Sequence, residues 1–105
     1  MTGTKKLEDI IKKLREPNKG CPWDIKQTHE TLLPYLIEEA YEVIDAINSK
    51  DSNNIKEELG DLLLQILLHT SIQEEKGRFK LQDVIDTLCE KLIRRHPHVF
   101  KNKIK

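Results

Sequence analysis

Four acidic residues recur at helical spacing near the middle of the chain. They are Glu38, Glu39, Glu42 and Asp45. In an α-helix these side chains share one face, within an arc of about 120°. Neighbours three or four positions apart then repel each other by about 0.2–0.5 kcal/mol per pair, and no Lys or Arg lies between Lys26 and Lys50 to relieve them. The pattern is compatible with a metal-binding cluster and equally with a plain acidic surface.

A second acidic pair, Glu58 and Asp61, lies in the most apolar stretch of the chain. Carboxylates are rarely buried without a partner, because removing an ion from water costs several kcal/mol. The nearest basic residues along the chain are Lys56 and Lys76. The pair therefore predicts a positively charged partner that is not a neighbouring side chain.

One divalent cation shared across two packed helices satisfies both acidic groups. Its predicted ligands are Glu39, Glu42, Glu58 and Asp61. Such an all-carboxylate set suits Mg²⁺, with Mn²⁺ possible, rather than zinc or copper. Di-iron bundles are the nearest rival, but they use Glu-x-x-His pairs, and Ile66 is the residue three positions before His69. Gly60 lacks a side chain and would let another backbone or a phosphate approach.

A basic group at the end of the last predicted helix suits the phosphates that Mg²⁺ commonly binds. Lys91 and Arg95 lie one turn apart, with Arg94 beside them. A basic last turn also complements the helix dipole, which is the structural alternative. Together with a separate, uncompensated acidic cluster, these residues favour phosphate binding.

Four helices must position these residues, and no segment with a period of two competes with them. We predict helices over 7–14, over 33–48 or 34–48, over 55–75 and over 81–95, with a loop over 18–24. Pro17, Gly77 and the pair His96-Pro97 supply stop signals. The class is all-α, a four-helix bundle-like domain. The expected buried stripe of the second helix is Leu36, Ile37, Ala40, Val43, Ile44 and Ile47.

The helix predicted over 55–75 is apolar around most of its axis. Its apolar residues are Ile55, Leu59, Leu62, Leu63, Leu64, Ile66, Leu67 and Leu68. Such a helix is stable only when it is covered on every side. We therefore predict a homodimer or larger assembly packed on this central helix; coverage by its three neighbours within one chain is the alternative.

The composition is that of an ordinary soluble domain. Of the 105 residues, 18 are Lys or Arg and 18 are Asp or Glu, so the formal net charge is zero. This balance argues against nucleic-acid or membrane-surface binding. Two cysteines, Cys21 in the loop and Cys89 in an expected core position, are too few for a disulfide framework. With no signal-like or membrane-spanning run, we expect one cytoplasmic domain over 1–105.

The ordered set of motifs over 7–100 resembles MazG-type nucleotide pyrophosphohydrolases. The motifs are Gly20-Cys-Pro-Trp-Asp24, Gln27-Thr28, Pro34-Tyr35, Glu38-Glu39-x-x-Glu42, Asp45-Ala46-Ile47, Glu58-Leu-Gly-Asp61 and Arg95-His-Pro-His-Val-Phe100. The resemblance implies an all-α enzyme that acts as a dimer or tetramer. Its reaction would convert a nucleoside triphosphate into the monophosphate and pyrophosphate, with Mg²⁺-activated water attacking the α-phosphorus. Such chemistry needs no Ser or Cys nucleophile.

The resemblance also implies roles for individual residues. The Mg²⁺ ligands would be Glu39, Glu42, Glu58 and Asp61. Glu38 would orient or deprotonate the attacking water. Lys91 and Arg95 match positions that contact the triphosphate, while Asn54 and Glu57 lie near the nucleotide.

Several alternatives stay open. Trp23 could stack on a base, since aromatic stacking tolerates every base, or it could anchor the loop around Pro22. Longer family members carry two copies of the domain, and these motifs resemble the first copy. The chain is therefore either a stand-alone form or part of a longer protein. The functional alternative is a non-catalytic nucleotide- or protein-binding helical dimerisation module, which would release no pyrophosphate.

Overall fold

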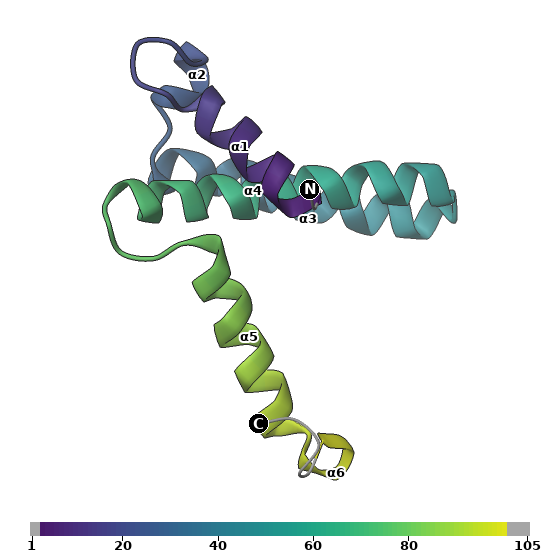
Figure 1. The fold of residues 1–105 in the computed structure, drawn as a ribbon. Coiled ribbons are helices and arrows are strands. Elements are labelled where there is room, and N and C mark those ends of the chain that lie inside the picture. Colours follow the sequence, from purple (N-terminus) through teal and green to yellow (C-terminus); the bar gives the residue numbers. More distant parts are fainter. Residues whose placement is uncertain (1–2, 101–105) are drawn as a thin grey trace.

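The computed structural model describes residues 3–100, and within them it contains helices and no strand. The elements are α1 (Gly3–Leu14), α2 (Pro22–Ile25), α3 (His29–Ser49), α4 (Ser52–Glu75), α5 (Leu81–Arg95) and α6 (Pro97–Phe100). In Figure 1, α3 and α4 lie side by side, α1 crosses them, and α5 points away. The predicted all-α, bundle-like class is confirmed. None of the described helices is both long and apolar enough to cross a membrane.

Helix α3 begins earlier than predicted. Its N-cap is Thr28, whose hydroxyl accepts a hydrogen bond from the Thr31 amide (3.2 Å), while the Thr31 hydroxyl accepts one from the Thr28 amide (2.8 Å). This reciprocal capping satisfies free amides of the first turn. Pro34 therefore lies inside α3, where its missing N–H leaves only the Glu30 carbonyl without its helical partner. The predicted start at Leu33 or Pro34 was wrong.

The segment predicted as a loop over 18–24 contains the start of α2, which has Pro22 at its first position. Proline suits this position because its fixed φ is helical and its missing N–H needs no partner there. The loop folds back on α1, where the Cys21 amide donates to the Leu14 carbonyl (2.8 Å). A Cβ at Gly20 would overlap the carbonyl oxygens of Leu14 and Lys13. Only glycine permits this close approach.

Arg15 ties α1, the loop and α4 together. Its Nε and Nη2 donate to the Glu75 carboxylate at 2.6 and 2.9 Å. Its Nη1 donates to the backbone carbonyls of Asp24 (2.6 Å) and Gln27 (3.2 Å). The Arg15 side chain is only 7% exposed, whereas that of Glu75 is 46% exposed, so the bonds to the backbone carbonyls are better shielded from water than the ion pair.

Replacing Arg15 with Ala is expected to lower the free energy of unfolding by about 2–3 kcal/mol, because two partly buried carbonyls lose a charged donor. Hydrogen bonding to Arg15 also lowers the pKa of Glu75 below its usual 4.5. The contribution of this pair is therefore present above the unfolded-state pKa of Glu75 and is lost as the pH falls through its folded-state pKa. Urea denaturation at neutral pH and near pH 3 should show a smaller Arg15→Ala effect in acid.

The matched control for this change is Lys12→Ala, in the last turn of α1 and three residues before Arg15. Lys12 pairs with Glu74 at 3.1 Å, but its side chain is 55% exposed. Exposed ion pairs contribute little to stability, so we expect a change within about 0.5 kcal/mol. Equal effects of the two substitutions would show that Arg15 does not anchor the loop.

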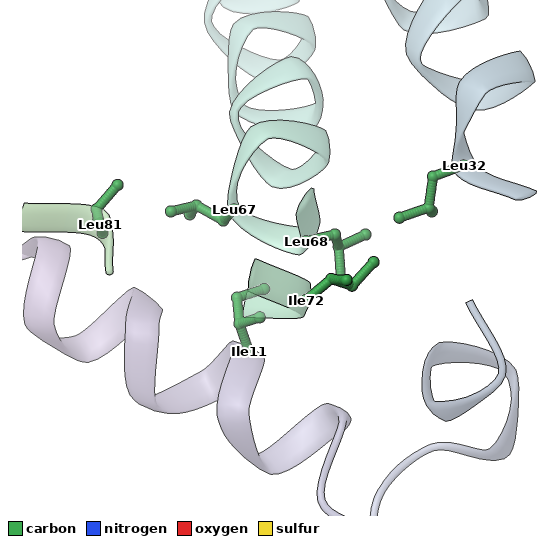
Figure 2. Packing of buried hydrophobic residues seen from close by; sticks show 6 residues of the cluster. All are labelled: Ile11, Leu32, Leu67, Leu68, Ile72 and Leu81. Atoms are coloured by element: carbon green, nitrogen blue, oxygen red, sulfur yellow. The ribbon is translucent and has the colours of Figure 1, made fainter. Parts of the chain in front are cut away.

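The hydrophobic core lies where α1, α4 and the first residues of α3 and α5 meet. Its buried members are Ile11, Leu32, Leu67, Leu68, Ile72 and Leu81. Figure 2 shows side chains from α1, α3 and α5 meeting those of the C-terminal half of α4. The N-terminal half of α4 packs on α3 alone, which leaves much of its surface uncovered.

One face of the α3–α4 pair is apolar and exposed. Its members are Ile37, Ile44, Ile47, Leu59, Leu63 and Ile66, which we call the apolar surface. Helical geometry places the members from both helices on the same side of the antiparallel pair. The prediction that Ile37, Ala40, Ile44 and Ile47 are buried is wrong within one chain. Helix α3 contacts α4 along a narrower stripe that includes Leu32, Leu36, Glu39, Val43 and Ala46.

Helix α5 leaves the core soon after it begins. Leu81 is buried in the core, but Leu88 and Leu92 are exposed because the helix points away from the α3–α4 pair (Figure 1). Cys89, which we expected in the core, is exposed for the same reason. The carboxyl end of α5 therefore projects from the molecule with its basic residues.

Candidate metal centre

Three carboxylates from two helices converge between α3 and α4. Glu39 of α3 and Glu58 and Asp61 of α4 each place an oxygen within 4.8 Å of the others. All three residues are half-buried. Glu39 lies on the stripe of α3 that faces α4, and the spacing of three residues turns Glu58 and Asp61 toward α3 together. The sequence thus anticipated the meeting of these three side chains, whose role as ligands stays a prediction.

The converging carboxylates lack compensating partners. Among the described residues, nothing donates a hydrogen bond to Glu39 Oε2 or Glu58 Oε1, although both atoms are buried. The ion pairs of the described chain are elsewhere, on α1, on the last turns of α4 and on α5. A buried carboxylate oxygen without a donor costs several kcal/mol. The arrangement therefore favours a bound cation.

The pKa values of two of these carboxyl groups reflect this crowding. Burial, followed by the charge of Glu42, raises the pKa of Glu39 to about 7. Burial also raises the pKa of Glu58, again with Glu42 as the next cause and Asp61 after it. Without a cation, the centre thus resists holding its full negative charge near neutral pH.

Glu42 borders the centre without being part of its inner group. Its side chain is exposed, yet its charge acts on both Glu39 and Glu58. It lies one turn after Glu39 on α3, close enough to join a shared ion. Glu38 and Asp45 are exposed on the same side of α3 and lie outside the converging group.

The donor set fits a hard divalent cation. The three converging side chains offer oxygen atoms alone, which Mg²⁺, Mn²⁺ and Ca²⁺ accept. His69, further along α4, lies outside the converging group: its Nδ1 lies 2.7 Å from Nδ1 of His29, Nε2 of His29 lies 2.7 Å from Nε2 of Gln73, and its own Nε2 is buried without a partner among the described residues. Burial, and then the charge of His29, lowers the pKa of His69. These histidines join α3 to α4 beside the core.

The structure does not bring every predicted site residue to the centre. Lys91 and Arg95 lie on α5, which points away from α3 and α4 (Figure 1). Asn54 and Glu57 lie about one turn before Glu58, and the charge of Glu57 contributes to the raised pKa of Glu58.

Trp23 lies on α2, where its ring meets that of Tyr35. The sequence assigned no role to Tyr35. The available signal was its position four residues before Glu39, which places the two side chains near each other on α3.

A surface cavity of about 610 Å³ lies between α1 and α4, and none of the three converging carboxylates of the candidate centre lines it. Both basic residues of its lining are already paired, since Lys12 contacts Glu74 and Arg15 contacts Glu75. The carboxylate cluster remains the stronger candidate because its buried polar atoms have no partner in the described chain.

Glu39→Gln is expected to stabilise the metal-free protein by about 1 kcal/mol at pH 8, allowing for screening by water. Because the folded-state pKa of Glu39 is raised to about 7, the carboxyl group is protonated in both the folded and the unfolded protein below the unfolded-state pKa. Above about pH 7 the folded protein carries the unfavourable charge, and the stability that the proton provided is lost. The gain should therefore vanish near pH 4. Urea denaturation with a chelator measures it, with the exposed Glu38→Gln as control. A destabilised Glu39→Gln protein at pH 8 would contradict this electrostatic explanation.

Comparisons with known proteins identify the family of this chain. Residues 27–100 match a family model described as the MazG nucleotide pyrophosphohydrolase domain. This range contains each candidate residue named above except Trp23. Over 97% of its length, the chain also resembles a solved mazG-related protein from Thermotoga maritima, with a TM-score of 0.72, 34% identity and 87% of that chain covered.

Curated relatives are closely similar over most of this chain. The chain is 62% identical over 94 residues to the nucleoside triphosphate pyrophosphohydrolase/pyrophosphatase MazG of Thermotoga maritima, covering 90% of this chain and 36% of the relative. It is 47% identical over 95 residues to a nucleoside triphosphate pyrophosphohydrolase of Escherichia coli, with the same two coverages. The chain thus spans about a third of the length of either relative.

Proposed function

Because this chain belongs to the MazG nucleotide pyrophosphohydrolase family, we propose that it hydrolyses nucleoside triphosphates, ribo- or deoxyribo-, to the monophosphate and pyrophosphate. One observation carries the proposal. Glu39, Glu58 and Asp61 converge, and buried oxygens of Glu39 and Glu58 have no hydrogen-bond partner among the described residues. The activity named for the two curated relatives supports the reaction, although both are much longer proteins.

Mg²⁺ is the proposed cofactor, with Mn²⁺ as a substitute. Glu39, Glu58 and Asp61 would hold it from the inner group, and Glu42 would complete the set from the exposed side of α3. The chemistry that a bound Mg²⁺ supplies is neutralisation of phosphate oxygens and a lowered pKa for water.

The side chains of the protein would carry the remaining work. Water attacks the α-phosphorus in line, the bond from that phosphorus to the α–β bridging oxygen breaks, and pyrophosphate leaves. The exposed Glu38 carboxylate would orient the water and accept its proton. Lys91 and Arg95 would stabilise the charge that develops on the leaving pyrophosphate. Asn54 and Glu57 would line the nucleotide side of the centre.

A homo-oligomer, a dimer or a tetramer, completes the proposal. The apolar surface gives it a physical basis, because a second copy packed there would remove its exposed side chains from water. In one chain, α5 points away from its own centre (Figure 1). We therefore propose that Lys91 and Arg95 serve the centre of a neighbouring copy.

The balanced charge of the chain favours a small nucleotide over nucleic acid or a membrane as its partner. We place the reaction in the cytoplasm, where the free thiols of Cys21 and Cys89 would stay reduced.

The test is hydrolysis of a panel of canonical and modified nucleoside triphosphates by the purified chain, with and without Mg²⁺. The proposal expects Mg²⁺-dependent pyrophosphate and monophosphate, and the panel would reveal any preference for base or sugar. Release of orthophosphate would show that a different bond is cut. Thermal stabilisation by nucleotides without any product would favour the non-catalytic binding module.

A further inference from the structure

Gln65 is a buried amide on the face of α4 that carries two of the candidate metal ligands. It is only 6% exposed, and nothing among the described residues donates a hydrogen bond to its Oε1. Gln65 follows Asp61 by four residues and Glu58 by seven, so it lies within about 40° of both around the helix axis. Amides are rarely buried without a partner, because the loss of their bonds to water costs free energy. The position of Gln65 therefore favours a role beyond packing.

His69 continues the same face of α4. It follows Gln65 by four residues, which places the two side chains about 6 Å apart along the helix axis and about 40° apart around it. The buried side-chain atoms that lack a partner within the described part of the chain belong to Glu39, Glu58, Gln65 and His69. Three of these residues lie on one stripe of α4, and Glu39 faces that stripe from α3. The unpartnered atoms thus form one continuous group between the two helices.

Hydrogen bonds determine where the two histidines carry their protons. Nε2 of Gln73 lies 2.7 Å from Nε2 of His29. The amide nitrogen can only donate, so this ring nitrogen accepts and a neutral His29 carries its proton on Nδ1. Nδ1 of His69, at 2.7 Å from Nδ1 of His29, then accepts, which leaves the proton of a neutral His69 on Nε2. Burial, which lowers the pKa of His69, favours this neutral form.

The unpartnered atoms of His69 and Gln65 are therefore complementary. Nε2 of His69 is a donor, and Oε1 of Gln65, one turn away, is an acceptor. An amide whose oxygen accepts from His69 keeps its nitrogen free to donate on the side of the carboxylates. Of the two unpartnered carboxylate oxygens, that of Glu58 belongs to a residue about 10 Å along α4 from Gln65. The oxygen of Glu39, which reaches the stripe from α3, is the better acceptor.

We propose that Gln65 is a positioning residue of the carboxylate centre, an inference that rests on the proposed function and its metal ion. Its amide nitrogen donates to Oε2 of Glu39, and its oxygen accepts from Nε2 of His69, directly or through one water molecule. Every N–H of the resulting chain donates toward the centre, in the order Gln73, His29, His69, Gln65 and Glu39. Outer donors of this kind hold a metal-binding carboxylate in one orientation.

Gln65→Met tests this role, because methionine has nearly the same length and shape but no amide. Isothermal titration calorimetry with Mn²⁺ should show a dissociation constant raised about 10- to 100-fold. The urea midpoint of the metal-free variant should stay the same or rise, since the variant no longer buries an unpartnered amide. A packing residue would not weaken metal binding while stability is retained. Unchanged Mn²⁺ affinity in Gln65→Met would overturn the inference.

The matched control is Thr70→Val, which removes another buried polar group from α4. Thr70 is also 6% exposed, but its hydroxyl donates to the Ile66 carbonyl of the same helix at 2.8 Å. It projects about 140° away from Gln65 around the axis. Its Mn²⁺ affinity should match that of the unmodified chain. Equal losses in Thr70→Val and Gln65→Met would refute a specific role for the Gln65 amide.

The link to the histidines has its own readouts. His69→Leu should weaken Mn²⁺ binding in the unmodified chain but not further in Gln65→Met, because His69 acts through Gln65. Full additivity of the two losses would contradict the link. Nitrogen NMR of the imidazole rings, without metal, should find the proton on Nδ1 of His29 and on Nε2 of His69. A His69 proton on Nδ1 would contradict the proposed chain of donors.

These measurements separate the inference from the proposed reaction. If Mn²⁺ binding depends on Gln65 but no nucleotide is hydrolysed, the reaction fails and the positioning role stands. If nucleotides are hydrolysed while Gln65→Met binds Mn²⁺ as tightly as the unmodified chain, the positioning role fails and the reaction stands.

Discussion

Glu58→Gln is expected to lower the rate of Mg²⁺-dependent pyrophosphate release by about 10³-fold or more. The substitution keeps the shape of the side chain but removes one of three converging negative charges. A hard cation held there would lose one charged ligand, and with it the attraction of one of the three negative charges. Asp61→Asn should have an effect of the same order, because its oxygen belongs to the same group. Initial rates at saturating nucleotide and several Mg²⁺ concentrations measure the loss.

A matched control for this loss is Glu74→Gln, which changes a carboxylate on the same helix. Glu74 pairs with Lys12 on the surface of α1 and lies outside the converging group. We expect its rate to stay within about twofold of the original, since the pair has an exposed Lys12 side chain, contributes little to stability and does not touch the centre. Comparable losses in Glu74→Gln and Glu58→Gln would mean that the rate follows general damage to α4.

Leu63→Glu is expected to dissociate the proposed oligomer into single chains. Leu63 lies within the apolar surface, so assembly would have to bury a new carboxylate with no partner, at a cost of several kcal/mol in each copy. Because Lys91 and Arg95 are proposed to serve a neighbouring copy, activity should fall by about 10²-fold or more. Light scattering after size-exclusion chromatography gives the mass, and the same samples give the rate.

Gln82→Glu serves as the comparison for this substitution, because it adds the same charge at an exposed position in the first turn of α5. Its mass and activity should match those of the unmodified chain. If Leu63→Glu leaves the mass unchanged, the apolar surface is not the interface. If the mass falls while activity persists, each chain supplies its own cations.

The helix boundaries could be predicted where strong local signals mark them. Helix α5 begins and ends as predicted over 81–95, because His96-Pro97 closes it. Helix α4 ends as predicted at Glu75, just before Gly77 with its left-handed φ of 71°. The start of α3 was missed because Pro34 resembles a first-turn proline. The reciprocal bonds between Thr28 and Thr31 determine the start instead.

The inner part of the candidate centre could be predicted because it depends on helical periodicity. A spacing of three residues places Glu58 and Asp61 on one face regardless of the rest of the fold. The direction of α5 depends on how Leu81 enters a core built from distant segments, which periodicity does not encode. Arg15 and Glu75 are likewise 60 positions apart, so neither reveals the other in the sequence.

The apolar pattern shows which residues avoid water but not what covers them. Ile44 and Leu68 look alike in the sequence, yet Leu68 is buried by the chain itself and Ile44 is half-exposed. The choice depends on α1, which covers the C-terminal half of α4 and leaves the half beside the carboxylates open. An amphipathic pattern therefore predicted burial correctly for one half of the helix pair and wrongly for the other.

Binding of Mn²⁺ tests the central claim, that carboxylates of α3 and α4 hold one divalent ion. Free Mn²⁺ can be followed by electron paramagnetic resonance as the protein is added, without nucleotide or turnover. We expect the unmodified chain to deplete the free signal with one principal site per carboxylate cluster, Mg²⁺ to restore it by competition, and Glu39→Gln and Asp61→Asn to lose most of this binding. Undiminished Mn²⁺ binding in both variants would contradict the centre proposed between α3 and α4.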